Sequence, residues 1–426
     1  MWRIRRWWAL LIARRLSSAA LVGLVALGLS AGPAEAMPRP VADPNPLVGD
    51  SVRDGETYLK VLNVSAAWTY ANGAGVTVAV IDSGVDAHHS DLEGQVLPGL
   101  DLVDPKGDGD TDLVGHGTTV SAIIAGRSDD TSGVIGIAPK ARILPVRVLN
   151  EENRYNDAII VAKGVRWAVD HGARVINLSL GGSGVSAPLA AALDYAFVKD
   201  VVVVACTGNV SASSSSEVWY PAREPGVIAV AGTDRDGIGL WPGSITGKET
   251  VVAAPATQLV GARAGGGYWE VQGTSFAAPM VSATAALIRS RWPTMPAGEV
   301  INRIIKTATD RGATGRDPIY GFGLVDPSAA LTAEVPAVVD NPLDTSPSPG
   351  IARFGAAPAS GQAQSAPNDP VSGMKPQLVG AEAGGGAAPA MTAPASSRHG
   401  WWVPAALFLL SSLAALLTIR RFAGAT

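Results

Sequence analysis

Cysteine is nearly absent from this sequence, and charged residues are scarce. The 426 residues include one cysteine, Cys206, so an intramolecular disulfide and a cysteine-based zinc site are both excluded, because each needs several thiols. Only 16% of the residues are charged, with a net charge of -4, and 47% are apolar. The lack of a basic excess argues against nucleic acid as a partner, and the apolar content excludes a disordered acidic protein.

The N-terminus is organised like a signal peptide. Arginines precede an apolar run, Leu16–Leu29, and Ala34-Glu35-Ala36 then places small residues where a signal peptidase reads them. The apolar run is short for a membrane span, so we predict cleavage of residues 1–36; an N-terminal anchor is the alternative. Residues 37–60 are too few and too poor in large apolar groups to form a pro-domain core, and we expect them to wrap the next domain as an extension.

The C-terminus predicts a membrane span. Residues 401–419 carry no charge, Trp401 and Trp402 mark one interface, and basic residues follow directly. We expect a transmembrane helix over 400–420 and a cytoplasmic tail over 421–426, which places the rest of the chain outside the cytoplasm; a buried core helix is the alternative. Residues 334–399 contain 10 Pro and 14 Ala with one aromatic residue and predict a flexible linker.

Residues 61–333 have the pattern of a doubly wound α/β domain with a mainly parallel sheet and helices on both faces. Short β-branched runs over 76–81, 174–178 and 201–205 predict strands buried on both faces. Helical periodicity over 156–171 and 187–199 predicts helices between them. In such sheets the chemistry gathers in loops beyond the carboxyl ends of the strands.

Four polar residues occupy such strand ends or helix starts. Asp82 follows a strand, His116 stands between two glycines before a helical run, Asn209 follows another strand, and Ser275 stands in a small-residue helix start, Gly273–Pro279. Each alone is also typical of a turn, a helix cap or a structural histidine. We expect the glycines to leave the imidazole exposed and the small neighbours to leave the serine hydroxyl uncovered.

Taken together, these residues resemble the subtilisin family of serine peptidases, in which Asp, His and Ser follow in this order. The resemblance runs from about residue 61 to 331. It implies that Ser275 is the nucleophile, that His116 is the general base and acid, and that Asp82 orients the imidazole. It also implies that Asn209 and the Ser275 backbone N–H bind the oxyanion.

The same resemblance implies where a peptide substrate binds. Ser179, Leu180, Gly181 and Gly182 resemble the edge segment that pairs with an extended peptide, and Thr207 and Gly208 resemble part of the pocket wall. Cys206 is then a small buried wall residue rather than a second nucleophile. Simple turn chemistry is the alternative for the glycines.

A narrower resemblance is to the mycosins, membrane-anchored subtilisin-like proteases of type VII secretion systems. The order of signal peptide, protease domain, linker and terminal span agrees with it, as do several motifs: Val64–Trp68, Gly73–Val80, Gly107-Asp108-Gly109, Tyr320–Pro327 and Ala329–Thr332. Two features depart from it, the lone cysteine and Ser90, which stands where a proline is expected.

This resemblance implies a serine endopeptidase anchored by one span in the cell membrane, with its catalytic domain outside and a type VII secretion complex as partner. The alternative is a structural subunit that braces a secretion machine, with proteolysis secondary, and a free scavenging protease is the third possibility. No cofactor is predicted. The acidic run Asp101, Asp104, Asp108, Asp110 and Asp112 could suggest calcium, but it lacks the glycine and glutamate of an EF-hand, and we expect a solvated loop and no metal.

Overall fold

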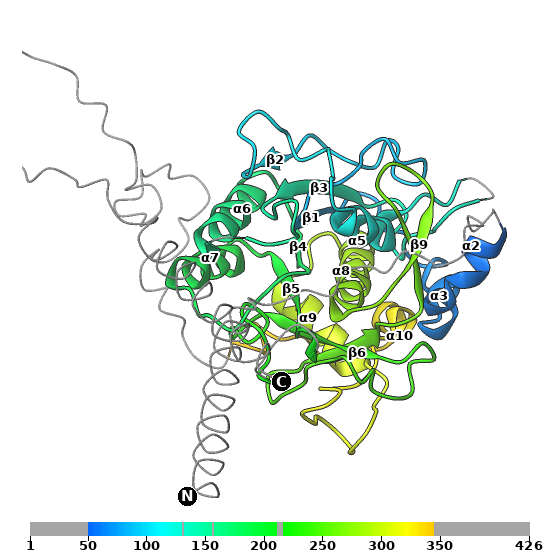
Figure 1. Ribbon diagram of the computed structural model, residues 1–426. Coiled ribbons are helices and arrows are strands. Elements are labelled where there is room, and N and C mark those ends of the chain that lie inside the picture. Colours follow the sequence, from blue (N-terminus) through cyan, green and yellow to red (C-terminus); the bar gives the residue numbers. More distant parts are fainter. Residues whose placement is uncertain (1–49, 130–131, 156, 211–215, 345–426) are drawn as a thin grey trace, which may run out of the picture. The chain divides into compact units, whose positions relative to one another are not determined.

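The computed structural model describes residues 50–344, apart from 130–131, 156 and 211–215 (Figure 1). The predicted signal peptide, most of the predicted linker and the predicted span over 400–420 lie outside the described residues. Among the helices that are described, none combines the length and apolar character that crossing a membrane requires.

Seven strands form one parallel sheet in the order β2-β3-β1-β4-β5-β6-β7. Strands β1, β4 and β5 match the three predicted runs, with β1 extending one residue further to include Asp82. Their side chains are buried almost throughout, as expected for strands covered on both faces. The strand bounds are Thr77–Asp82 (β1), Leu100–Asp101 (β2), Arg142–Arg147 (β3), Val175–Leu178 (β4), Val202–Cys206 (β5), Ile228–Thr233 (β6) and Val252–Pro255 (β7).

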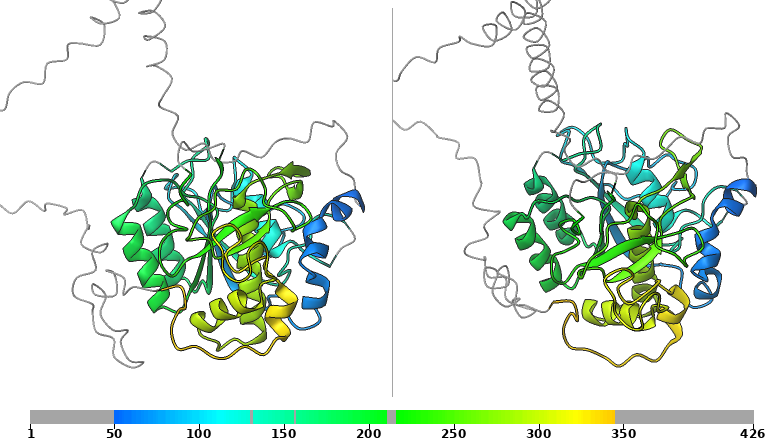
Figure 2. Two further views of the ribbon diagram at one scale, coloured as in Figure 1. Left: turned by 90° about the horizontal axis from the view of Figure 1, so that it is seen from below. Right: turned by 60° about the horizontal axis from the view of Figure 1, so that its bottom comes forward.

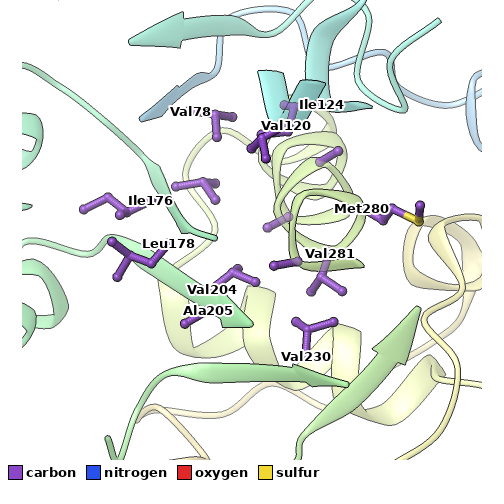
Figure 3. Packing of buried hydrophobic residues seen from close by; sticks show 14 of the residues in the cluster. Val78, Val120, Ile124, Ile176, Leu178, Val204, Ala205, Val230, Met280 and Val281 are labelled. Carbon is purple, nitrogen blue, oxygen red and sulfur yellow. The ribbon is translucent and has the colours of Figure 1, made fainter. Parts of the chain in front are cut away.

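Helices cover both faces of this sheet, which confirms the doubly wound α/β prediction. Helices α6 (Ala158–Asp170) and α7 (Ala187–Val198) pack together on one face, and α5 (His116–Ala125) and α8 (Thr274–Arg291) pack on the other (Figures 1 and 2). Helices α9 (Ala297–Thr307) and α10 (Pro327–Thr332) contact α8. Small side chains on α8 let it lie close to the strands, and Figure 3 shows Val281 among Val204 and Val230 of the neighbouring strands.

The strand order brings polar residues that are far apart in the sequence to one edge of the sheet. Strand β1 lies between β3 and β4, so the chain runs outward in both directions from β1, and ligand crevices form at such a switch point. Asp82 ends β1, Ser179 follows β4 and Asn209 follows β5. A separate antiparallel pair, β8 (Leu259–Ala262) and β9 (Tyr268–Val271), packs beside α5.

The described part of the N-terminal extension is helical and belongs to the packed core. It forms α2 (Asp50–Gly55) and α3 (Thr57–Val61), followed by α4 (Val64–Ala67), and α3 crosses the predicted boundary between residues 60 and 61. Val52 and Tyr58 are fully buried. The Arg53 guanidinium donates hydrogen bonds to the carbonyls of Gly133 and Ser132. The extension therefore contributes to the hydrophobic core of the domain.

The first residues of the predicted linker also lie along the domain. The Asn302 amide donates to the Pro336 carbonyl at 2.9 Å, and Gly226 exchanges hydrogen bonds with Leu343 and Asn341. The described chain therefore stays bound to the domain through these residues rather than leaving it at residue 334.

Candidate active site

Asp82 and His116 form a buried pair. The His116 Nδ1 atom lies 2.7 Å from Asp82 Oδ1, and both side chains are fully buried. The Ser83 backbone N–H donates to the same carboxylate oxygen at 2.7 Å. Since the carboxylate accepts, the imidazole carries its proton on Nδ1 and leaves Nε2 as the basic nitrogen. This is the tautomer that a general base needs.

The expectation that flanking glycines leave His116 exposed is wrong, because its exposed fraction is 0%. The glycines instead allow the backbone at the start of α5 to approach its neighbours closely. A Cβ atom on Gly117 would lie 2.1 Å from the Gly84 carbonyl oxygen, and Gly115 takes a left-handed φ of 91° against the Trp269 ring. The loop after β1 and the start of α5 therefore press together, and this contact holds the imidazole against Asp82.

Asp112 ties these two segments to each other. Its Oδ1 accepts from the Ser83 hydroxyl at 2.9 Å and from the Gly115 N–H at 2.8 Å, and its Oδ2 accepts from the Thr118 N–H and hydroxyl at 2.9 and 2.7 Å. Asp112 is 7% exposed. Asp112 therefore positions Ser83 and Gly115, the chain neighbours of Asp82 and His116.

Ser275 stands in the first turn of α8, as predicted, but its hydroxyl is not uncovered, since the residue is 1% exposed. Gly273 is the helix N-cap, with a φ of 147° that suits glycine, so Ser275 does not cap the helix. The Ser275 Oγ lies 3.9 Å from Cys206 Sγ. Cys206 is buried in the wall of the site, where the sequence analysis placed it.

A chain of buried hydrogen bonds supports the backbone of Ser275. Pro279 has no N–H, so the Ser275 carbonyl lacks the donor that an α-helix would supply four residues later. The Ser179 hydroxyl donates to that carbonyl instead. Asn177 Nδ2 donates to Ser179 Oγ at 2.9 Å, and the Ser282 hydroxyl donates to Asn177 Oδ1 at 2.8 Å. These hydrogen bonds link β4 to helix α8, which carries Ser275.

Asn209 has a fixed orientation at the same site. Its Oδ1 accepts from the Thr274 N–H at 3.0 Å and from the Thr274 hydroxyl at 3.1 Å. Thr274 Oγ1 also accepts from the Gly208 N–H at 3.2 Å. Asn209 Nδ2 is buried and has no acceptor among the described residues. An unpaired buried donor beside the helix that carries Ser275 is the geometry expected of an oxyanion donor.

The two halves of the site meet where α5 packs on α8. The ring centroids of His116 and Phe276, the residue after Ser275, lie 5.2 Å apart. The fold therefore brings the elements that carry Asp82, His116, Asn209 and Ser275 together at one edge of the sheet.

The predicted substrate-binding residues occupy two adjacent segments. Leu180 is buried, and its carbonyl lies 3.9 Å from Cys206 Sγ. Gly182 exchanges hydrogen bonds with Tyr220 at 3.0 and 2.8 Å, so its backbone N–H is already used. A cavity of about 640 Å³ opens beside Gly181 and Gly182; its other lining residues come from 154–155, 157–159 and 183–188.

The acidic run is less solvated than expected. Asp101 is 7% exposed, forms an ion pair with Arg147 at 2.9 Å and accepts from nearby backbone N–H groups, and Asp112 is buried as described above. In the part of the chain that the structure describes, no three His, Cys, Asp or Glu side chains gather as metal ligands would.

Sequence reasoning did not identify Asp112, Asn177 and Ser282 as site residues. Asn177 offered a signal, because it is a polar residue inside an otherwise apolar strand. Asp112 stood in the acidic run, and its burial depends on contacts between β1 and α5 that the pattern does not contain. Ser282 could not be distinguished by sequence from the other small residues of the segment that forms α8.

The fold and this site define the class of a subtilisin-like serine endopeptidase. Residues 73–323 match the model of the subtilase family. The chain belongs to the subtilase family. Subtilisin DY of Bacillus licheniformis is 39% identical over 259 residues, which cover 61% of this chain and 91% of that protein. Fervidolysin of Fervidobacterium pennivorans is 36% identical, and the match spans 63% of this chain but only 42% of fervidolysin.

The mycosins are among the relatives, as the narrower resemblance predicted. Mycosin-1 of Mycobacterium tuberculosis (strain ATCC 25618 / H37Rv) is 35% identical over 353 residues, covering 69% of this chain and 77% of that protein. The crystal structure of MycP1 from the ESX-1 type VII secretion system matches with a TM-score of 0.62 and 31% identity, over 74% of this chain and 92% of that one. The chain is therefore a mycosin-related protease of subtilisin type.

Proposed function

We propose that the protein hydrolyses peptide bonds through the triad Asp82, His116 and Ser275, by way of an acyl-enzyme. The observation that carries this proposal is the buried 2.7 Å contact between Asp82 and His116, which leaves Nε2 as the basic nitrogen beside α8, whose first turn carries Ser275. His116 takes the hydroxyl proton as Ser275 attacks the carbonyl and returns it to the leaving amine. Asp82 stabilises the imidazolium without becoming protonated.

Asn209 and the Ser275 N–H bind the oxyanion in this proposal. Because Thr274 holds the amide oxygen, the Nδ2 donor is aimed before substrate arrives and needs no reorganisation during the reaction. The peptide pairs with the segment Ser179–Gly181, and the 640 Å³ cavity beside Gly181 receives another of its side chains.

A fluorophosphonate probe tests the chemistry directly. The full-length wild type should be labelled on Ser275 and should cleave a mixed peptide library, whereas Ser275→Ala should do neither and His116→Ala should be labelled far more slowly. Melting temperatures close to that of the wild type would show that the variants fold. Labelling of Ser275→Ala at the wild-type rate would refute the assignment of the nucleophile.

We further propose that residues 400–420 anchor the protease in the cell membrane, with its catalytic domain outside the cytoplasm, and that it works with a type VII secretion complex. The uncharged 401–419 run supports the anchor, and the kinship to mycosin-1 and to MycP1 of a type VII system supports the partner. Carbonate extraction should leave the full chain in the membrane and release a chain that ends at residue 399. Secretion that survives Ser275→Ala but not deletion of the whole chain would instead favour a bracing role.

A further inference from the structure

A buried tryptophan fills the space between the two predicted substrate-binding segments. Trp219 is 1% exposed. Its backbone N–H donates to the Thr207 carbonyl at 2.9 Å, and the next residue, Tyr220, exchanges two hydrogen bonds with Gly182. Residues 219–220 therefore join the wall that contains Gly182 to the wall that contains Thr207, and they form the floor between them.

The indole ring occupies the gap above that floor. A Cβ atom placed on Gly208 would lie 2.4 Å from Trp219 Cδ2 and 2.5 Å from Cε2, so the ring lies directly against the Gly208 backbone. A Cβ atom on Gly181, in the opposite wall, would lie 3.1 Å from Trp219 Cβ and 3.3 Å from Cε3. Only glycine fits at position 208, where the φ of 106° is also left-handed. The ring is thus wedged between Gly181 and Gly208.

The position of the indole matters because each wall ends beside a residue of the proposed active site. Asn209, which follows Gly208, carries the proposed oxyanion donor, and the Ser179 hydroxyl at the start of the other wall supports the Ser275 carbonyl. A substrate carbonyl placed between Ser275 and Asn209 therefore directs the side chain of its own residue into the gap between the walls. That gap already contains the indole, so a large side chain would have to displace a packed ring.

We propose that Trp219 closes the specificity pocket and restricts cleavage to bonds that follow a small residue such as glycine, alanine or serine. The inference rests on the proposed function, because it uses the same carbonyl position. The wall residues Leu180, Cys206 and Thr207 are fully buried as well, so their side chains are already packed and leave no room beside the ring.

A positional-scanning peptide library with the full-length protein tests this. The wild type should cleave after alanine with a kcat/KM roughly 100-fold or more above that for phenylalanine or leucine, because forcing a large group into a filled core site is strongly unfavourable. Trp219→Gly should shift the preference towards leucine and phenylalanine by at least roughly tenfold. Trp219→Leu, which leaves a smaller void, should admit intermediate side chains and provides a second variant if the glycine variant does not fold.

Trp292→Leu is the matched control. Trp292 is a partly buried tryptophan that packs on the core at the far end of α8, and its replacement should leave the cleavage profile unchanged. A fluorophosphonate probe carries no substrate side chain, so it should label wild type and all three variants. Labelling of the wild type together with efficient cleavage after phenylalanine would overturn this inference alone, whereas absence of labelling would overturn the proposed function and this inference with it.

Discussion

The hydrogen bond from Ser179 to the Ser275 carbonyl allows a quantitative test. Ser179→Ala removes the donor to a buried carbonyl and also leaves Asn177 Nδ2 without its acceptor. Each buried polar group that loses its partner costs about 1–3 kcal/mol, so the free energy of unfolding should fall by about 2–6 kcal/mol. The carbonyl belongs to Ser275, the proposed nucleophile, so the reaction barrier should also rise. We expect kcat to fall about tenfold, which corresponds to about 1.4 kcal/mol, with KM less affected.

A second substitution should restore one of the two hydrogen bonds that Ser179→Ala removes. Pro279→Ala restores a backbone N–H four residues after Ser275, in position to donate to the same carbonyl. In the Ser179→Ala background it should recover part of the lost stability and kcat, while Asn177 Nδ2 stays unpaired. In the wild-type background the carbonyl already has a donor, so the gain should be smaller. The difference between the effects of Pro279→Ala in the two backgrounds measures the coupling free energy between positions 179 and 279.

Urea unfolding and steady-state hydrolysis of one peptide across the four proteins provide the data. Ser290→Ala is the control, because this serine lies on the same helix but makes its hydrogen bond to Ala74 near the surface, and it should change the unfolding free energy by less than about 0.5 kcal/mol. Equal effects of Pro279→Ala in both backgrounds would refute the reasoning.

Three further changes have defined outcomes. Asn209→Ala should lower kcat about 10²–10³-fold, the magnitude established for such a donor in subtilisin. A smaller loss in a variant that folds normally would show that Asn209 does not bind the oxyanion. Asp112→Ala should lower both the melting temperature and kcat, with KM less affected, because it frees Ser83 and Gly115, the chain neighbours of Asp82 and His116; an unchanged kcat at a lowered melting temperature would contradict a positioning role. Burial raises the pKa of Glu56 from 4.5 to about 8, so the folded protein holds this proton while the unfolded chain has lost it, and stability should fall as pH rises between these values. Glu56→Gln should flatten that decline in melting temperature from pH 5 to 9, and parallel curves for both proteins would exclude Glu56 as its source.

The sequence predicted those parts of the site that depend on local pattern. Parallel strands end at one edge, so Asp82 and Asn209 could be brought together from the positions of two apolar runs. The glycines around His116 and Ser275 marked two helix starts that the fold brings together. The strand and helix assignments held within a few residues because each element has its own strong periodicity.

The parts that could not be predicted depend on contacts between distant segments. The same glycines that suggested exposure of His116 serve close packing, and the sequence does not distinguish these two uses. The role of the Ser179 hydroxyl follows from Pro279, which lies 100 residues later in the chain and leaves a carbonyl without a donor. The burial of Asp112 is equally non-local, because its partners come from the loop after β1 and from α5.

The distance along the chain between Asp82 and Ser275 has a consequence for synthesis. These residues are 193 positions apart, and the proposed nucleophile lies on α8, which contacts five strands that precede it in the chain, β1, β4, β5, β6 and β7. A nascent polypeptide that ends before residue 275 already contains Asp82 and His116 but lacks the serine that is proposed to attack. The proposed active site is therefore completed only when this late helix docks onto strands that were synthesised before it.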